Sequence, residues 1–251
     1  MSDHRPIRVV GLNGSPHHQG NTVALMGWVL EGCLAAGTET DWIHVVDYDI
    51  QYCRGCFTCL RTGECPIKDD FLALRSRLLA ADGIVVGSPV YADAPPAVFK
   101  AFLDRLTLLN LYTNTFDRQF SIGVATSGIA PTTGVANSLA SMFGRSSGVI
   151  GAKTSSVARG YKPLATAHDP NLPGKARALG RRLVADIRGP HRWRVPQREY
   201  LIYLLLTRTF LYPMVVGNPE QFGGVLRIWA EKGHAPGGRK IHNNKWIGDL
   251  S

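Results

Sequence analysis

The sequence predicts an α/β fold in which a five-stranded parallel sheet, with strand order 2-1-3-4-5, carries helices on both faces. Short apolar runs alternate with longer segments of helical periodicity along the first 189 residues, as in β-α-β units. Small and polar residues follow several of these runs, where open α/β sheets bind their ligands. The chain has 251 residues, which suits one large domain with an appendage.

The expected strands are short apolar runs bounded by Gly, Asp or other polar residues. They are Ile7–Leu12, Thr40–Val46, Gly83–Gly87, Phe120–Thr126 and Val149–Val157. The helices expected to connect them either repeat apolar residues at helical spacing or start at residues that favour a first turn, such as Asp69 or Asp70 and Pro95–Pro96. They are Asn21–Ala36, residues 70–79, Ala97–Leu109, Thr132–Phe143 and Gly174–Ile187.

The alternation stops after Gly189. We therefore expect residues 1–189 to form a ligand-binding domain, and residues 190–251 to form a mainly helical or irregular extension rich in aromatic and basic residues, with one helix over Arg198–Leu211. Residues 1–162 hold 14 Lys and Arg against 13 Asp and Glu, whereas the remaining residues hold 14 against 6. Such a region can meet nucleic acid, an anionic membrane or an acidic protein, but its scattered charges favour a simple solvated surface.

The N-terminal residues and the most apolar segment indicate the cellular compartment. The first 16 residues show no signal-peptide pattern, and the most apolar segment, 200–217, is short for a membrane span and is interrupted by Arg208 and Pro213. We expect a cytoplasmic protein that does not span a membrane. In that compartment, five cysteines indicate metal, cluster or thiol chemistry rather than disulfides.

The first candidate site is the loop after the first strand, GLNGSPHHQGNT at residues 11–22. Backbone N–H groups at the start of the next helix, together with the side chains of Ser15, Asn21 and Thr22, can hold a phosphate. Gly14 and Gly20 allow the backbone to approach it closely. The loop has no G-K-[ST], so hydrolysis of nucleoside triphosphates is not expected. A generic strand–helix turn is the alternative.

This loop resembles the G-S-P-R-x-x-S/G-N-T loop of the NAD(P)H-dependent FMN reductases, a family with the flavodoxin-like fold, and the resemblance extends over roughly residues 6–187. His17 stands where the family commonly has arginine, which is the stronger phosphate ligand. The resemblance implies that the FMN phosphate is bound by Ser15, His17, Gly20, Asn21 and Thr22.

Two later loops extend the same resemblance. SPVYAD at residues 88–93, followed by PPAVFKAFLDRL, is similar to the family segment that meets the flavin edge, which implies contacts from Pro89, Val90, Tyr91 and Ala92. TSGIAPTTG at residues 126–134 matches the loop that closes over the flavin ring, which implies contacts from Ser127 and Gly128. All three loops are expected at the carboxyl ends of strands, so they would meet in one crevice.

The second candidate site is YCRGCFTCLRTGECP at residues 52–66, with the spacing C-x2-C-x2-C-x5-C from Cys53, Cys56, Cys59 and Cys65. Cysteine thiolates are the usual ligands of [4Fe–4S] clusters. The run resembles the compact motif of the iron–sulfur flavoproteins, a branch of the same family. Zinc and free redox-active thiols are the alternatives. Cys33 is expected in the core, on the apolar face of its helix.

These features predict an oxidoreductase in which NADPH or NADH reduces FMN, and electrons pass on, directly or through a [4Fe–4S] cluster, to a small-molecule or protein acceptor. No catalytic side chain is required, because the cofactors supply the chemistry. An electron carrier between protein partners is the alternative, and a redox or metal sensor is a third. Members of the family are commonly dimers or tetramers, which implies a homo-oligomer. Nucleic acid is not an expected partner.

Overall fold

The computed structural model describes residues 5–154, 169–189 and 207–232, together with the backbone of three short strands between 234 and 246. The chain divides into two compact units. We call the first the sheet unit; it comprises Met1–Tyr52, Lys68–Asp104 and Phe116–His191. We call the second the cysteine unit; it comprises Cys53–Ile67, Arg105–Thr115 and Arg192–Ser251. Among the described helices, none is long and apolar enough to cross a bilayer.

The sheet unit confirms the predicted α/β fold. Its five strands are all parallel and follow the order β2-β1-β3-β4-β5. They are β1 (Arg8–Asn13), β2 (Glu39–His44), β3 (Gly83–Pro89), β4 (Phe120–Ser127) and β5 (Arg145–Lys153). The helices of this unit are α1 (Asn21–Ala35), α3 (Phe71–Leu79), the first half of α4 (Ala97–Thr113), α5 (Thr133–Met142) and α6 (Leu172–Arg188), with a short 3₁₀ turn η1 (Val45–Asp47) after β2.

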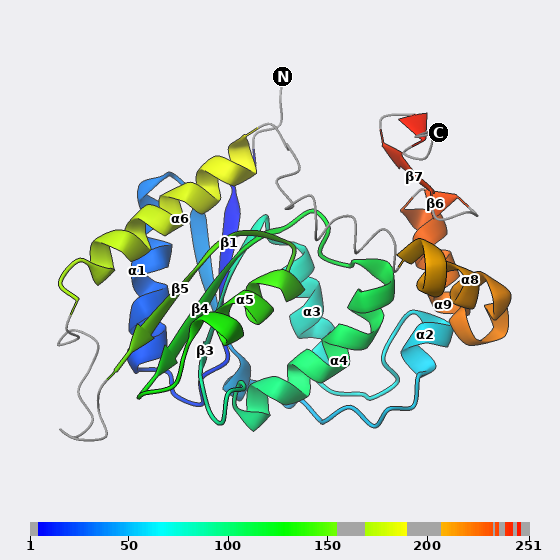
Figure 1. Cartoon of the computed structure of the whole chain (residues 1–251), viewed down its shortest axis with the longest axis horizontal. Helices are drawn as coiled ribbons and strands as arrows, with labels where there is room; N and C mark the ends of the chain where they lie inside the picture. Colours follow the sequence, from blue (N-terminus) through cyan, green and yellow to red (C-terminus); the bar gives the residue numbers. More distant parts are fainter. Residues whose placement is uncertain are drawn as a thin grey trace. The chain divides into compact units, whose positions relative to one another are not determined.

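The core of this unit lies on both faces of the sheet. Side chains alternate along β4, so Ile122 and Val124 pack in the buried cluster with α1 and α6, while Gly123 lies under α5 on the other face. Figure 1 shows α1 and α6 together on one side of the strands. The backbones of these two helices approach closely at Gly180, where a Cβ would lie 2.0 Å from the carbonyl oxygen of Val29.

One predicted strand was placed wrongly. The fifth strand was expected over Val149–Val157, but β5 begins at Arg145 and ends at Lys153; residues 155–157 lie outside the described residues. Its first residues, Arg-Ser-Ser-Gly, carry no apolar pattern, because an edge strand need not bury both faces. The register between β4 and β5 also shifts beside Ile122, opposite Gly148.

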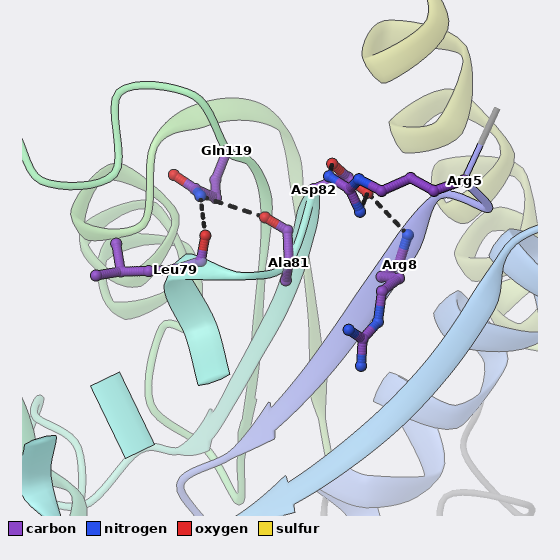
Figure 2. A network of polar contacts seen from close by, with 6 residues as sticks. All are labelled: Arg5, Arg8, Leu79, Ala81, Asp82 and Gln119. Carbon is purple, nitrogen blue, oxygen red and sulfur yellow. Dashed lines mark hydrogen bonds and ion pairs between the residues drawn. The ribbon is translucent and has the colours of Figure 1, made fainter. Parts of the chain in front are cut away.

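The amino ends of the strands are joined by a polar network (Figure 2). The Asp82 carboxylate accepts two hydrogen bonds from the Arg5 guanidinium, at 3.1 and 2.6 Å, and one from the Arg8 backbone N–H at 2.9 Å. Gln119, just before β4, donates to the carbonyls of Leu79 and Ala81, between α3 and β3, at 3.0 and 3.2 Å. The N-terminal arm is thereby attached at the edge of the sheet opposite the carboxyl ends of the strands.

The cysteine unit contains the helix α2 (Thr58–Thr62), the second half of α4, a π-helical turn (Thr207–Leu211), α8 (Tyr212–Gly217) and α9 (Pro219–Glu231). It also contains three short antiparallel strands, β6 (His234–Ala235), β7 (Arg239–His242) and β8 (Lys245–Trp246). The C-terminal region is therefore helical where its side chains are described, as expected. Most of the helix predicted over Arg198–Leu211 lies outside the described residues.

Candidate functional site

The three loops predicted to bind a ligand meet at the carboxyl edge of the sheet. The first loop is joined to the end of β3, because the N–H of Gly14 donates to the Gly87 carbonyl at 2.8 Å. The N–H of Val90 donates to the Thr126 carbonyl at 2.8 Å, which joins the second loop to the third. The hydroxyls of Thr22 and Thr126 lie 2.7 Å apart. The start of α1 and the ends of β3 and β4 thus enclose one site.

The buried side chain of Asn13 determines the shape of the first loop. Its Oδ1 accepts the N–H of Ser15 at 3.0 Å, which identifies the other amide atom as the nitrogen. That Nδ2 donates to the His17 carbonyl at 3.1 Å and to Nδ1 of His44 at 2.9 Å. The Ser15 hydroxyl in turn accepts the N–H of His17 at 3.2 Å. The loop is therefore closed on itself before any ligand binds.

Gly14 is required for a reason that the sequence does not reveal. It was expected to let the backbone approach a phosphate. A Cβ at this position would lie 1.9 Å from Cδ1 of the fully buried Phe99, which belongs to α4. The space beside Gly14 is thus filled by an aromatic ring, and the glycine allows the loop to lie directly on α4.

The amino end of α1 has properties that suit an anionic ligand with hydroxyl groups. No side chain caps this helix, so its first N–H groups point toward the loop with their partial positive charge. Asn21 is buried, and its Oδ1 has no hydrogen-bond partner among the residues that the structure describes. An unsatisfied buried acceptor costs about 1–3 kcal/mol. The phosphate and ribityl hydroxyls of FMN would satisfy these groups, so the residues fit that cofactor.

Thr22 has a different role from Asn21. Its hydroxyl is buried and is paired with that of Thr126, so it joins the helix start to β4. Its backbone N–H remains in the first turn of α1, where an anion would bind. The side chain of His17 is exposed at the mouth of the loop.

The second loop is a tight turn with two consecutive left-handed residues, Ala92 (φ 48°) and Asp93 (φ 59°). Tyr91 and Ala94 exchange backbone hydrogen bonds across it, at 2.8 and 3.0 Å. The N–H groups of Val90 and Tyr91 are therefore already bonded to backbone carbonyls, and Pro89 has no N–H. Of the four residues expected to meet the flavin edge, Ala92 is the one whose amide we retain as a candidate donor. Tyr91 contributes a half-exposed ring.

The third loop begins at Ser127, which is buried at the end of β4. Its carbonyl accepts the N–H of Thr154 at 2.6 Å, so the loop is attached to the chain that leaves β5. Gly128 is half-buried, and the next residue, Ile129, is 75% exposed. An exposed isoleucine beside the site offers an apolar surface to a ring system.

A group of aromatic and titratable residues borders the first loop. His44 stacks on Trp42, with ring centroids 5.6 Å apart, and lies 4.7 Å from His18. His18 Nε2 also lies 2.6 Å from Asp47 Oδ1. Burial and the neighbouring His18 lower the pKa of His44, while Asp47 opposes the shift. Since Asn13 donates to its Nδ1, the neutral form of His44 is the one that fits this network.

The cysteine loop changes direction through left-handed residues. Gly55 (φ 63°), Phe57 (φ 55°) and Gly63 (φ 84°) adopt this conformation between the four cysteines. Phe57 precedes the short helix α2, which carries Cys59, and Gly63 ends it. A left-handed phenylalanine is strained relative to glycine. The backbone of this loop is thus bent at three points within ten residues.

The environment of the thiols shifts the pKa values of two of them. Burial raises the pKa of Cys59 to about 11, and Cys65, Cys53 and Cys56 add to the shift. Hydrogen bonds from Thr58 lower the pKa of the exposed Cys56. Among the described residues, which include all four cysteines, no group of three or more metal-ligating side chains is arranged as a metal site. The set matches an iron–sulfur cluster in the number and type of its ligands.

Cys65 has a charged neighbour within the same unit. Nη2 of the buried Arg105 donates to its Sγ at 3.4 Å and to the Ile67 carbonyl at 3.5 Å. Cys33, by contrast, lies in the core of the sheet unit, as expected; burial raises its pKa to about 12 and its thiol donates to the Gly180 carbonyl.

Several residues of the site were missed from the sequence. Asn13, Thr126 and His44 hold the loops together, and Phe99 supports the first loop from α4. Asn13-Gly14 directly after an apolar strand was a detectable signal, because Asn there readily bonds to the backbone that follows. Thr126, His44 and Phe99 become recognisable only once the strands are paired.

Together the fold and its three loops define a flavodoxin-like α/β protein. The family model described as NADPH-dependent FMN reductase matches residues 7–162, and the chain belongs to this family.

The relatives point to one branch of it. An iron–sulfur flavoprotein of Methanocaldococcus jannaschii is 38% identical over 99 residues, which cover 39% of this chain and 51% of that protein. An iron–sulfur flavoprotein of Clostridioides difficile is 22% identical over 226 residues, which cover 88% of this chain and 97% of that protein. The chain spans about half the length of the first relatives it matches (51%, 60% and 46%).

A solved structure supports the fold. The NAD(P)H:quinone oxidoreductase from Methanothermobacter marburgensis superimposes with a TM-score of 0.52 at 13% identity, over 75% of this chain and all of that one. The expected family and fold are thus confirmed, and FMN-dependent oxidoreduction is the activity that the family name describes.

Proposed function

We propose that this protein passes electrons from NADPH or NADH through FMN, and through a [4Fe–4S] cluster on the cysteine loop, to a small-molecule or protein acceptor. The single observation that carries the proposal is the junction of three loops at the carboxyl edge of the sheet, where the uncapped helix α1 begins with a buried, unsatisfied amide oxygen on Asn21. The relatives named iron–sulfur flavoproteins support the second cofactor.

In this proposal each loop binds one part of FMN. The N–H groups of α1, with Ser15, Gly20, Asn21 and Thr22, hold the phosphate and ribityl chain, and His17 adds a donor at the loop mouth. The amide of Ala92 and the ring of Tyr91 position one edge of the flavin, with Pro89 and Val90 supporting their turn. Ser127 and Gly128 border it from the third loop.

FMN supplies the redox chemistry, since it takes up a hydride and releases electrons singly or in pairs. The protein therefore needs no acid–base pair at the reacting atoms. The half-exposed Tyr91 and the exposed Ile129 leave an apolar surface beside the site on which a nicotinamide or a planar acceptor can stack.

The cysteine loop provides the ligands of the second cofactor. Cys53, Cys56, Cys59 and Cys65 are the four thiolates that we assign to it, and an iron–sulfur cluster would exchange single electrons there. The four free thiols suit a reducing, cytoplasmic compartment. A homodimer or homotetramer, with residues 1–189 as the FMN-binding domain, completes the proposal.

Anaerobic purification, followed by assays of FMN, iron and sulfide per chain, tests both cofactors. We expect about one FMN and about four irons per chain. Failure to bind added FMN would overturn the proposal. FMN without iron after anaerobic reconstitution would restrict it to a flavin reductase with free thiols.

Stopped-flow reduction separates the enzyme from its alternative. Rapid bleaching of the flavin by NADPH or NADH supports the reductase. Reduction by a ferredoxin, without reduction by either nicotinamide, would instead identify an electron carrier between proteins.

A further inference from the structure

Two basic residues, one in the last described helix α9 and one just after it, bind the carboxyl ends of two other helices of the cysteine unit. Nη2 of Arg227 donates to the carbonyl of Thr62, the last residue of α2, at 2.6 Å. Nζ of Lys232, just after α9, donates to the carbonyls of Thr113 and Asn114 at the end of α4, at 3.1 and 2.8 Å. The last carbonyls of a helix lack hydrogen-bond partners within it and carry partial negative charge. A cation there both donates a hydrogen bond and offsets this charge.

An apolar core joins the same three helices. Trp229 packs against it while its indole N–H donates to the Tyr112 carbonyl at 2.8 Å. Leu60 contributes from α2, and it is the residue directly after Cys59. The members of this core are 5% exposed or less: Leu60, Leu109, Val215, Phe222 and Val225. The cysteine loop thus shares a hydrophobic core with the C-terminal helices.

The backbone of α9 also touches the turn between two of the cysteines. A Cβ on Gly224 would lie 2.0 Å from the backbone nitrogen of Gly63. That nitrogen donates to the Cys59 carbonyl at 2.8 Å and closes α2, after which the chain leads to Cys65. Only glycine at position 224 allows this approach, so a side chain there would displace the turn.

We propose that residues 212–232 form part of the cluster site: α9 holds the turn between Cys59 and Cys65 in the arrangement that retains the cluster. The inference rests on the proposed cluster and deepens it. It also gives two of the C-terminal cations, Arg227 and Lys232, contacts within the cysteine unit, although the Arg227 side chain is 60% exposed and also lies 3.8 Å from Glu231. The loop changes direction at three left-handed residues, so contacts from a packed helix help to fix its conformation.

The decisive comparison is Gly224→Ala against Gly217→Ala. Both glycines lie in the C-terminal helices, but a Cβ on Gly217 meets nothing within 4 Å. After anaerobic reconstitution, we expect an iron chelator to strip iron from Gly224→Ala at least about tenfold faster than from wild type. FMN per chain stays the same, and Gly217→Ala matches wild type. Equal iron loss in Gly224→Ala and wild type, or equal losses in the two variants, would overturn the inference.

Arg227→Gln tests the same contact without disturbing the packing. Loss of a charged donor to Thr62 should speed iron release about fivefold, the effect of one hydrogen bond. Arg182→Gln is its control, because Arg182 is an exposed arginine of α6 that pairs with Asp186 one turn away. Iron release from Arg227→Gln at the rate of the Arg182→Gln control would contradict the role of Arg227.

Hydrogen exchange in metal-free protein distinguishes this inference from the proposed function. We expect the amides of Leu60 and Gly63, which are bonded within α2, to lose protection in Gly224→Ala. Unchanged exchange there would overturn the role of α9. Absence of iron from reconstituted wild type would overturn the cluster itself.

Discussion

The sheet unit and the cysteine unit hold their candidate ligand-binding residues by different means. In the sheet unit, the loops leave buried parallel strands and are joined to one another by backbone hydrogen bonds and by the side chain of Asn13. In the cysteine unit, a five-residue helix and three left-handed residues present the thiols, and a helix from more than 150 residues further along the chain supports them. The first site is therefore shaped by loops of its own fold, whereas the second depends on contacts from residues far along the chain.

The largest expected effect, which distinguishes the two candidate sites, comes from removing one thiol. Cys59→Ser should lower bound iron by at least about tenfold while FMN content stays at the wild-type level, because the two proposed cofactor sites use different residues. Iron and flavin assays on the same sample measure both. Cys33→Ser is the control, since Cys33 is buried in the core of the sheet unit. Equal iron loss from both variants would show that folding, and not ligation, is being measured.

The second test disturbs the contact between the first loop and α4. Gly14→Ala places a methyl group against the ring of Phe99, so either the loop or α4 must shift. We expect a loss of about 1–3 kcal/mol in the free energy of unfolding, with weaker FMN binding. Urea unfolding and flavin fluorescence measure the two effects.

Gly27→Ala is the matched control for that change. A Cβ on Gly27 meets nothing within 4 Å, and alanine is the better helix former, so a gain of about 0.5–1 kcal/mol is expected. If Gly14→Ala bound FMN with wild-type affinity, the shape of the first loop would not matter for the ligand.

The third test acts at the opposite edge of the sheet. Asp82→Asn weakens the contacts with Arg5 shown in Figure 2 and should lower the free energy of unfolding by about 0.5–1 kcal/mol. FMN affinity should not change, because the network lies at the amino ends of the strands. A coupled loss of affinity would mean that the two edges of the sheet are not independent.

Much of the sheet unit could be predicted from the sequence because its signals are local. Gly83–Gly87 and Phe120–Thr126 are apolar runs bounded by polar residues, and a strand buried on both faces requires such a run. The ligand loops follow from the rule that these folds bind at the carboxyl ends of their strands. The polar start of β5 has no such signal, so its position was predicted wrongly.

The remaining features depend on tertiary contacts. The hydroxyl pair of Thr22 and Thr126 joins residues 104 positions apart, and no local pattern reveals it. Likewise, no local pattern reveals that Arg227, an exposed charge of the basic C-terminal region, caps α2 across 165 positions. The spacing of the cysteines predicts the type of ligand, but the helix that supports their loop cannot be inferred from that spacing.

The smallest expected effect concerns pH and tests how far the sheet unit is independent of its ligand. The pKa of His44 is lowered, chiefly by burial and then by His18, so between that lowered value and about 6.5 the unfolded chain binds more protons than the folded one. The stability that this group contributes is therefore present above about pH 6.5 and is lost as the pH falls below it. Protonation at Nδ1 also ends the hydrogen bond from Asn13 that shapes the first loop.

We accordingly expect FMN affinity to fall about threefold more in wild type than in His44→Gln between about pH 7.5 and about pH 5.5, since glutamine still accepts a hydrogen bond but does not titrate. The phosphate of FMN titrates in the same range, so the difference between the two proteins, and not either curve alone, is the measure. Fluorescence titration of FMN at several pH values provides it. Parallel curves would show that the Asn13 network tolerates a protonated His44, and that the first loop keeps its shape through its backbone bonds alone.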